Sequence, residues 1–331
     1  MPLLPEQRAQ FDSEGWVIVE DVFDRSDFVE LLDDFETVVD NISHEIHEHT
    51  EADTLAEDAS FEDKYKWMVC QTASMAHKSV SHKIENPWPG LNGNPFDISL
   101  PQRDIKTDTR MYTGAPAFQL LRHDPLLDLV EDLIGPEITS NPVQHIRLIP
   151  PHDLVEENPG KATEWHQDVG VVSDDADDTP MLTAWVPITD APVDHGFLAV
   201  MPRGHQLGVW QHCVTDQHIA LSSADVAQDA MEPLPMRSGS VLFMTSFTPH
   251  RALPNVSDHV RISMDLRYQP TGYPTGRKWF PAFVARSRSQ PTSELHDANA
   301  WAAMWAEARD ALAAGTEPKF NRWDRTGIGC A

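Results

Sequence analysis

The chain has 331 residues, with 52 Asp and Glu against 25 Lys and Arg and a formal net charge of −27. This length buries a sizeable core in one large domain or two ordinary ones. A hydrophobic fraction of 40%, with 13 Phe and 10 Trp, excludes global disorder. The acidic excess argues against nucleic acid or an anionic membrane as a partner, because phosphate contact needs clustered Lys and Arg.

The acidic bias has a particular composition, with 32 Asp but only 8 Lys. Simple solubility charge explains it, and a surface suited to high ionic strength, where salt screens self-repulsion, is the alternative. The cysteines Cys70, Cys213 and Cys330 form no CxxC pair, which predicts neither a disulfide framework nor a thiolate zinc site. No secretory leader or spanning apolar run is visible, so we expect a cytoplasmic protein.

The N-terminal third is predicted to be mainly helical. Residues 5–13 form a short amphipathic helix that Gly15 ends, and Trp16 to Val19 form a strand. Ser26 is expected to cap a helix whose apolar residues recur at helical spacing. Residues 42–63 receive no assignment, residues 64–81 are helical, and residues 86–101 form a long loop rich in Pro, Gly and Asn. A further helix, 124–134, ends at Gly135.

From residue 138 the pattern changes to short β-rich runs. They cover residues 143–149, 182–187, 197–201, 240–244 and 260–269, with Gly-containing turns between them. This spacing is typical of an antiparallel sandwich or jelly roll. We therefore expect a mainly β fold with flanking α-helices and one domain over residues 1–331. Its parts would be a helical region of about 1–137, a β core of about 138–285 and a helical tail of about 286–331.

The sharpest motif is Trp165-His166-Gln167-Asp168. Residues two apart in an extended segment project to the same side, so His166 and Asp168 can reach one metal ion together. His250, which follows the strand 240–244, is the natural third ligand. Two histidines and one carboxylate form the facial set of non-haem Fe(II) oxygenases, which leaves three coordination positions open. An HxD motif alone is weak, and a hydrogen-bonded polar pair at a strand end is its alternative.

The strand after His250 strengthens the metal interpretation. Its residues alternate, with Val260 and the apolar residues on one face and Arg261, Ser263, Asp265 and Arg267 on the other. A half-buried strand with a solvated polar face would show the same pattern. If the polar face instead points into the β core, Arg261 and Ser263 could bind a carboxylate, because Arg offers a bidentate fork for that task. Such a carboxylate anchor beside a metal is what a 2-oxoglutarate site requires.

Taken together, these motifs resemble the phytanoyl-CoA dioxygenase family of Fe(II)/2-oxoglutarate-dependent oxygenases. The similarity covers most of the chain and rests on segments in the family's order: residues 4–19, 126–135, 165–168, 182–191, 196–205 and 250–261. It implies a double-stranded β-helix, that is, a cupin-like jelly roll. It also implies iron held by His166, Asp168 and His250, and 2-oxoglutarate anchored by Arg261.

The resemblance also suggests secondary site residues. Trp185 matches a family Trp near the co-substrate, although a core aromatic on a strand is an equal alternative. Gln144 and Arg147, on the strand before the HxD motif, are further candidates for co-substrate or substrate binding. Two positions depart from the family pattern. Arg203-Gly204 stands where the family has Gly-Ser, and Ala252 stands where it often has a small hydroxyl residue.

The function implied by the resemblance is hydroxylation of an unactivated C–H bond of a small metabolite, coupled to conversion of 2-oxoglutarate and O2 to succinate and CO2. Related halogenases carry a small residue at the position of Asp168, so this carboxylate favours oxygenation. Two alternatives stay open: a cupin-like metal enzyme that does not use 2-oxoglutarate, and a non-catalytic small-molecule-binding barrel.

Three weaker signals have simpler explanations. The histidines at 44, 47 and 49 are expected to lie on a solvated helix face rather than to form a metal cluster. The acidic run 174–178 is expected to be an exposed loop, with attraction of a cation as the alternative. His205, His212 and His218 surround Trp210 without the spacing of metal ligands.

Overall fold

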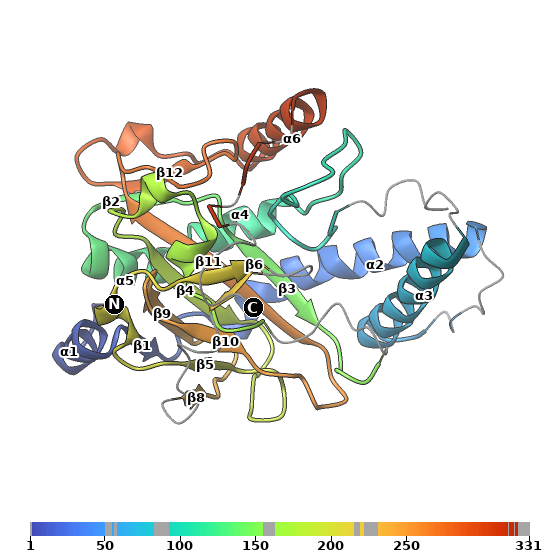
Figure 1. Ribbon diagram of the computed structural model, residues 1–331, viewed down its shortest axis with the longest axis horizontal. Coiled ribbons are helices and arrows are strands. Elements are labelled where there is room, and N and C mark those ends of the chain that lie inside the picture. Colours follow the sequence, from blue (N-terminus) through green and yellow to red (C-terminus); the bar gives the residue numbers. More distant parts are fainter. Residues whose placement is uncertain are drawn as a thin grey trace.

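The computed structural model describes residues 2–49, 55, 58–82, 93–154, 163–214, 219–221, 231–316, 318–320 and 322–323. A large antiparallel sheet lies at its centre and helices surround it (Figure 1). The strand order is β1-β9-β4-β11-β2-β12, and β3 pairs with the first half of β11 on the edge opposite β4. Its strands are β1 (Trp16–Val19), β2 (Glu137–Ser140), β3 (His145–Ile149), β4 (Leu182–Pro187), β9 (Val241–Thr245), β11 (Arg261–Pro270) and β12 (Phe283–Ser287).

A smaller sheet faces the large one. Its order is β10-β5-β8, from β10 (His250–Ala252), β5 (Leu198–Val200) and β8 (Glu232–Leu234). Strands β6 (His212–Val214) and β7 (Ile219–Leu221) pair antiparallel as a separate two-stranded sheet. One buried apolar cluster joins the two sheets, with Trp16, Trp185 and Leu242 from the large sheet and Leu198 and Val200 from the small one. Two antiparallel sheets that share an interior layer form a sandwich, as the turn spacing predicted.

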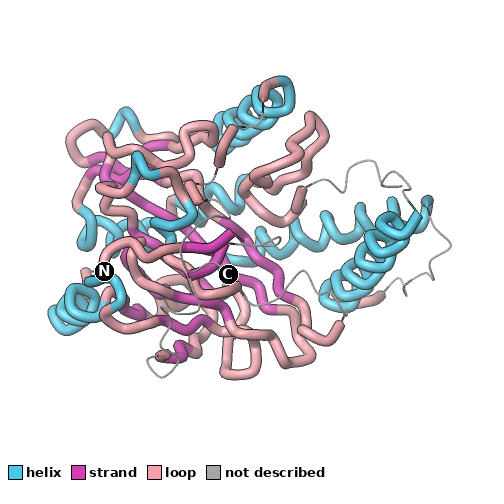
Figure 2. The backbone as a smooth tube through the Cα atoms, viewed as in Figure 1, coloured by secondary structure: helices cyan, strands magenta, loops and turns pink. Residues whose placement is uncertain are grey.

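Helices cover the outer face of the large sheet, as Figure 2 shows by colour. They are α1 (Pro5–Glu14), α2 (Val29–His49), α3 (Phe61–His82), α4 (Ala115–Leu121), α5 (Asp124–Ile134) and α6 (Ala298–Ala314). Leu31 and Phe35 of α2 pack in one cluster with Ile262, Met264 and Leu266 of β11. Because the apolar face of β11 is buried under the helices, its other face must point into the sandwich.

The predicted strand 16–19, strand 182–187 and helix 124–134 appear with the same bounds. Ser26 was wrongly predicted as a helix cap: a 3₁₀ turn, Arg25–Phe28, precedes α2, and Asp24 caps that turn. Helix α2 continues to His49, where no assignment was made, and α4, β2, β6, β7, β8, β10 and β12 were not predicted. Part of the predicted loop, residues 86–92, lies outside the described residues.

The structure describes the state of two cysteines and the apolar character of the helices. Cys70 is a free thiol, whereas Cys213 takes part in a disulfide, so the prediction of no disulfide was wrong at Cys213. Among the described residues, no helix combines the length and the apolar character needed to cross a bilayer.

Candidate metal centre

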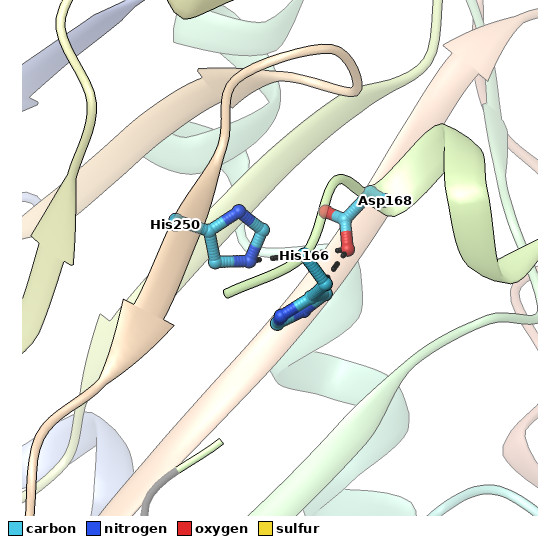
Figure 3. A group of neighbouring side chains, drawn as sticks. All are labelled: His166, Asp168 and His250. Carbon is cyan, nitrogen blue, oxygen red and sulfur yellow. Dashed lines mark ion pairs between the residues drawn. The ribbon is translucent and has the colours of Figure 1, made fainter. Parts of the chain in front are cut away.

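His166, Asp168 and His250 converge in space, with their ligand atoms all within 4.8 Å of one another (Figure 3). The Nε2 atoms of both histidines lie 4.0 Å from the same oxygen, Oδ1 of Asp168. Asp168 is fully buried and His250 nearly so, whereas the His166 side chain keeps 15% of its surface exposed. The three residues therefore form a compact set of two nitrogens and one oxygen that stays open on the His166 side.

The backbone brings the two histidines together. His166 and His250 form an isolated antiparallel bridge, in which each N–H donates to the other carbonyl at 3.0 and 2.9 Å. His250 begins β10, which pairs with β5 of the small sheet. Asp168 begins a 3₁₀ turn, Asp168–Val171, and the N–H of Val169 donates to Ser246 at 2.9 Å. The set is therefore fixed by main-chain hydrogen bonds between segments about 80 residues apart.

Each histidine has its ring orientation set by a backbone carbonyl. Nδ1 of His166 lies 2.9 Å from the carbonyl of Glu164, and Nδ1 of His250 lies 3.0 Å from that of Thr248. A carbonyl only accepts, so Nδ1 carries the proton in both rings and Nε2 is left with a lone pair. Metal-binding histidines are usually held in this way, with the second ring nitrogen donating to a fixed acceptor.

The protonation states suit a divalent cation. Burial, followed by the nearby His250, lowers the pKa of His166 to about 3 against the pull of Asp168, so its imidazole is neutral at physiological pH. Burial opposes ionisation of Asp168, but the charge of Arg267 outweighs it and holds the pKa of this carboxyl well below its usual range. A neutral imidazole and an ionised carboxylate are the forms that bind metal.

Two residues hold the Asp168 carboxylate. The guanidinium of Arg267 donates to Oδ1, and the hydroxyl of Thr183 donates to Oδ2. Arg267 also contacts Asp265 at 3.3 Å, and its side chain is only 2% exposed. The sequence placed Arg267 on the polar face of its strand, as a possible source of positive charge at the site, without pairing it with Asp168, and Thr183 was missed. The available signal was that Thr183 lies two residues before Trp185 in the same strand, so that both side chains point to the same face.

The polar face of β11 points into the sandwich and is not solvated. Arg261 is 1% exposed and Ser263 is fully buried. Arg261 donates to the carbonyl of Gly196, but among the described residues its Nε has no hydrogen-bond partner, and neither does Oγ of Ser263. Burial, with the neighbouring Arg147, lowers the pKa of Arg261 to about 9, which leaves it a cation at neutral pH. Unpaired buried donors beside a cation fit a bound anion.

The remaining predicted residues are placed as follows. Trp185 is buried opposite Asp265, and the Arg261 guanidinium lies over its ring at 5.5 Å from the centroid. Arg147 lies directly opposite Ser263 on the neighbouring strand β3. Gln144 is 3% exposed and donates to Ser140 at 2.6 Å, while its Oε1 has no partner among the described residues. Arg147 and Trp185 thus flank Arg261 and Ser263, whereas the Gln144 amide supports the chain between β2 and β3.

Among the described residues, the weaker sequence signals form no second centre; His218 lies outside them. On α2, Nδ1 of His44 contacts the Asp40 carbonyl at 2.8 Å, and the His47 ring packs on Trp67 at 5.1 Å. His212 is fully buried, and its Nε2 accepts the N–H of Gln167 at 3.0 Å. Within the part of the chain that the structure describes, the three residues at 166, 168 and 250 form the one group arranged for a metal ion.

The sequence of this chain matches a known protein family. The model of the phytanoyl-CoA dioxygenase (PhyH) family matches residues 11–263, about three quarters of the chain. The chain belongs to this family. The match confirms the resemblance inferred from the sequence. It includes His166, Asp168, His250, Arg261 and Ser263, and it ends before the last strand β12 and helix α6.

Two curated relatives match about half of the chain. The chain is 31% identical over 164 residues to a 1-deoxypentalenic acid 11-beta-hydroxylase of Streptomyces exfoliatus, covering 46% of the chain and 56% of that protein. It is 29% identical over 184 residues to the enzyme of the same name from Streptomyces arenae, covering 52% of the chain and 64% of that protein. The aligned part therefore spans less than two thirds of either relative.

Solved structures support the fold. The apo form of the non-heme monooxygenase ThoJ superposes with a TM-score of 0.57 at 15% identity, covering 92% of this chain and 97% of that chain. Its nickel complex gives a TM-score of 0.53 at 14% identity, covering 91% and 96% of the two chains. These likenesses confirm the predicted mainly β, jelly-roll architecture with flanking helices.

Both departures from the PhyH pattern can be located. Arg203, in place of the family's Gly, has a φ of +61°, the left-handed region that favours glycine. It closes the turn before Gly204, where a Cβ would approach Pro249 to 2.5 Å. Ala252 is 7% exposed at the end of β10, and its N–H donates to the Thr163 hydroxyl oxygen at 2.8 Å. The turn is thus kept despite the substituted glycine.

Proposed function

We propose that this chain is an Fe(II)- and 2-oxoglutarate-dependent dioxygenase that hydroxylates an unactivated C–H bond of a small molecule and releases succinate and CO2. One observation carries the proposal. Two imidazoles and a carboxylate converge in the same buried interior onto which Arg261 and Ser263 present unpaired donors. The three protein ligands leave three of six coordination positions open on the metal, and Arg261 and Ser263 lie ready to bind a carboxylate. This arrangement suits an oxo acid that binds the metal through two atoms and has a second carboxylate.

His166, Asp168 and His250 would hold the iron. Their donor set of nitrogen and oxygen, without thiolate, suits ferrous iron better than structural zinc. When bound, the iron with 2-oxoglutarate and O2 supplies the oxidising chemistry, which belongs to the cofactor rather than to the protein. The chain's task is to fix the three ligands. It does so through the reciprocal backbone bridge between the histidines and through Arg267 and Thr183 on the carboxylate.

Arg261 would pair with the distal carboxylate of 2-oxoglutarate. Its buried guanidinium is aligned by the Gly196 carbonyl and by the Trp185 ring, so it is already oriented before the ligand arrives. Ser263 would donate a second hydrogen bond to the same carboxylate. Arg147, across from Ser263, adds positive charge to an otherwise acidic protein. These groups form a local cationic site that a chain of net charge −27 needs in order to bind a dianion.

Hydroxylation is the favoured outcome because both curated relatives are named hydroxylases. Retention of Asp168 as the third ligand agrees with oxygenation, since loss of the carboxylate would open a position for a halide. Trp185 is proposed to border the co-substrate, and Gln144 to face it through Oε1, the atom of its amide that has no partner among the described residues. We infer a small-molecule substrate, with neither nucleic acid nor a membrane as partner; a single domain and a cytoplasmic location stay predictions.

The deciding experiment is anaerobic reconstitution of the purified protein with Fe(II) and 2-oxoglutarate, followed by measurement of succinate on adding O2 and a metabolite panel. We expect stoichiometric iron binding, a visible charge-transfer band when 2-oxoglutarate joins the iron, and succinate release. His166→Ala should abolish all three. Arg261→Ala should keep iron while losing the band, because it removes only the carboxylate anchor.

Different outcomes identify the alternatives. Turnover that is unchanged in Arg261→Ala would favour a cupin-like metal enzyme that does not use 2-oxoglutarate. Absence of Fe(II) binding by the wild-type protein would favour a non-catalytic small-molecule-binding barrel. Succinate formation that His166→Ala leaves intact would show that another part of the chain, or a contaminant, is responsible.

A further inference from the structure

The C-terminal segment lies across the loop that follows the carboxylate ligand. Four consecutive backbone carbonyls after Asp168 receive hydrogen bonds from three side chains. Those side chains are Arg277, from the loop after β11, and Arg322 and Trp323, from the C-terminal segment 318–323. The four carbonyls belong to Val169, Gly170, Val171 and Val172. These residues end a 3₁₀ turn, where carbonyls have no partner within the turn itself.

Arg322 spans the loop. Its guanidinium donates to the carbonyl of Val169 and, at 2.9 Å, to that of Val172, and it forms an ion pair of 2.6 Å with Asp177. The Arg322 side chain is 11% exposed, whereas Asp177 is 41% exposed. One member of the acidic run 174–178 therefore has a defined role, as the counter-ion of a buried arginine. The planar fork of Arg is the group that can serve three acceptors in this way.

Trp323 adds a second contact. Its indole N–H donates to the carbonyl of Gly170 at 2.6 Å, and its ring stacks on His212 with centroids 5.4 Å apart. The His212 ring in turn accepts the N–H of Gln167, the residue between the two metal ligands. There is no spare room in this layer, because a Cβ on Gly170 would lie 2.2 Å from the His212 ring. The loop is thus held from both sides.

We propose that Arg322 and Trp323 are positioning residues for the metal centre: they fix the loop 168–172 so that the Asp168 carboxylate faces His166 and His250. This inference rests on the proposed function. It goes beyond the family likeness, because the family match ends at residue 263 and does not include the segment. Groups that orient metal ligands typically change metal affinity by about 10-fold to 100-fold when they are removed.

Conservative substitutions test the proposal in the full chain. Arg322→Lys keeps a charge for Asp177 but replaces the planar fork, whose separate nitrogens reach the two carbonyls, with a single ammonium nitrogen. Trp323→Phe keeps the ring on His212 but removes the N–H. Asp177→Asn, at a partly exposed position, weakens the ion pair only. The matched controls are Arg309→Lys, which alters an Arg–Asp pair on α6, and Trp67→Phe, which alters a Trp–His contact on α3.

The measurements are Co(II) affinity of each metal-free protein by anaerobic calorimetry, the visible spectrum of bound Co(II), and the unfolding midpoint without metal. We expect the dissociation constant to rise about 10-fold for Arg322→Lys and for Trp323→Phe, and less for Asp177→Asn. The Co(II) spectrum should also change, whereas both controls should match the wild type. A segment that only stabilised the fold would lower the unfolding midpoint and leave affinity and spectrum unchanged.

The outcomes separate this inference from the proposed function. Wild-type protein that binds no Co(II) or Fe(II) would overturn both. Wild-type protein that binds metal, with Arg322→Lys and Trp323→Phe binding equally tightly, would overturn the positioning role alone. Equal loss of affinity in the control variants would also overturn it, because the effect would then not depend on the loop.

Discussion

Replacement of Arg267 by Met tests whether this residue is the counter-ion of the metal carboxylate. The side chains of Arg267 and Asp168 are 2% and 0% exposed, so water cannot replace the lost charge. Removal of one partner from a buried ion pair costs about 3–5 kcal/mol, because the remaining charge stays buried and uncompensated. The metal-free variant should therefore lose about 3–5 kcal/mol of unfolding free energy at neutral pH. Met is chosen because it roughly fills the volume of the arginine stem.

A bound dication should reduce this loss. In the metal-loaded variant, the ion next to Asp168 supplies the positive charge that Arg267 supplied before. Arg267→Met lowers the unfolding free energy by one amount without metal and by another amount with metal. By thermodynamic linkage, the difference between these two amounts equals the change that the substitution causes in metal-binding free energy. A rescue of about 1.4 kcal/mol corresponds to a tenfold tighter dissociation constant. We expect a rescue of at least this size, because the variant also removes a cation that repels the incoming ion.

The assay is urea unfolding followed by circular dichroism, with a chelator in one series and saturating Co(II) in the other. Arg286→Met is the matched control, since Arg286 is a largely buried arginine that pairs with Asp124, Asp128 and Glu131 away from the centre. It should lose the same stability in both series. Equal losses for Arg267→Met in the two series would refute the counter-ion role, and so would a loss below about 1 kcal/mol in the metal-free series.

Three further changes have expected outcomes. Thr183→Val removes a buried hydroxyl that donates to Asp168, and it should lower the unfolding free energy of the metal-free protein by about 1–3 kcal/mol. Arg203→Gly should raise it by about 0.5–1 kcal/mol, because relief of the left-handed conformation exceeds the entropy cost of glycine. Burial lowers the pKa of His212 to about 4 in the folded protein, whereas its pKa in the unfolded chain is about 6.5. Below about pH 6.5 the unfolded chain therefore binds more protons at this site than the folded protein does, which favours unfolding. Between about pH 6.5 and 5 this should cost the wild-type apoprotein about 2 kcal/mol more than His212→Gln.

Each of these outcomes can fail separately. Urea unfolding at fixed pH measures the first two, and unchanged stability in Thr183→Val would show that its hydroxyl does not hold the carboxylate. A destabilised Arg203→Gly would mean that the ion pair of Arg203 with Glu14, 69% and 30% exposed, matters more than surface pairs usually do. Parallel pH profiles of wild type and His212→Gln would show that His212 does not titrate with a lowered pKa.

Local patterns in the sequence predicted much of the fold. The helix 124–134 and the strands 16–19 and 182–187 carry their own periodicity and end signals, and the structure has the same bounds. The very short strands β6 to β8 and β10, which were missed, have three residues each, too few for a period to show. Strand β12 and helix α4 were missed as well. Their pairing depends on partners far away in the chain, which no local pattern reports.

In the candidate metal centre, too, the sequence predicted what depends on local patterns and left open what depends on contacts between distant parts of the chain. The HxD spacing and the alternation around Arg261 are local, so His166, Asp168 and Arg261 could be identified from one sequence. His250 could be proposed because it follows a strand, and the backbone bridge to His166 confirms that the two lie together. The alternating strand left open whether its polar face meets water or the interior. Burial of Arg261 and Ser263 decides for the interior.

The sequence by itself determined the family, the class of metal ligands and the acidic surface, because these depend on residue types at short and fixed spacing. Only the tertiary structure decided what supports the ligands. Arg267 and Thr183 reach Asp168 from other strands, and Arg322 and Trp323 reach its loop from about 150 residues away. A hydrogen bond needs only proximity in space, and spacing along the chain does not encode it. The supporting contacts of the centre therefore become visible only when the chain is folded.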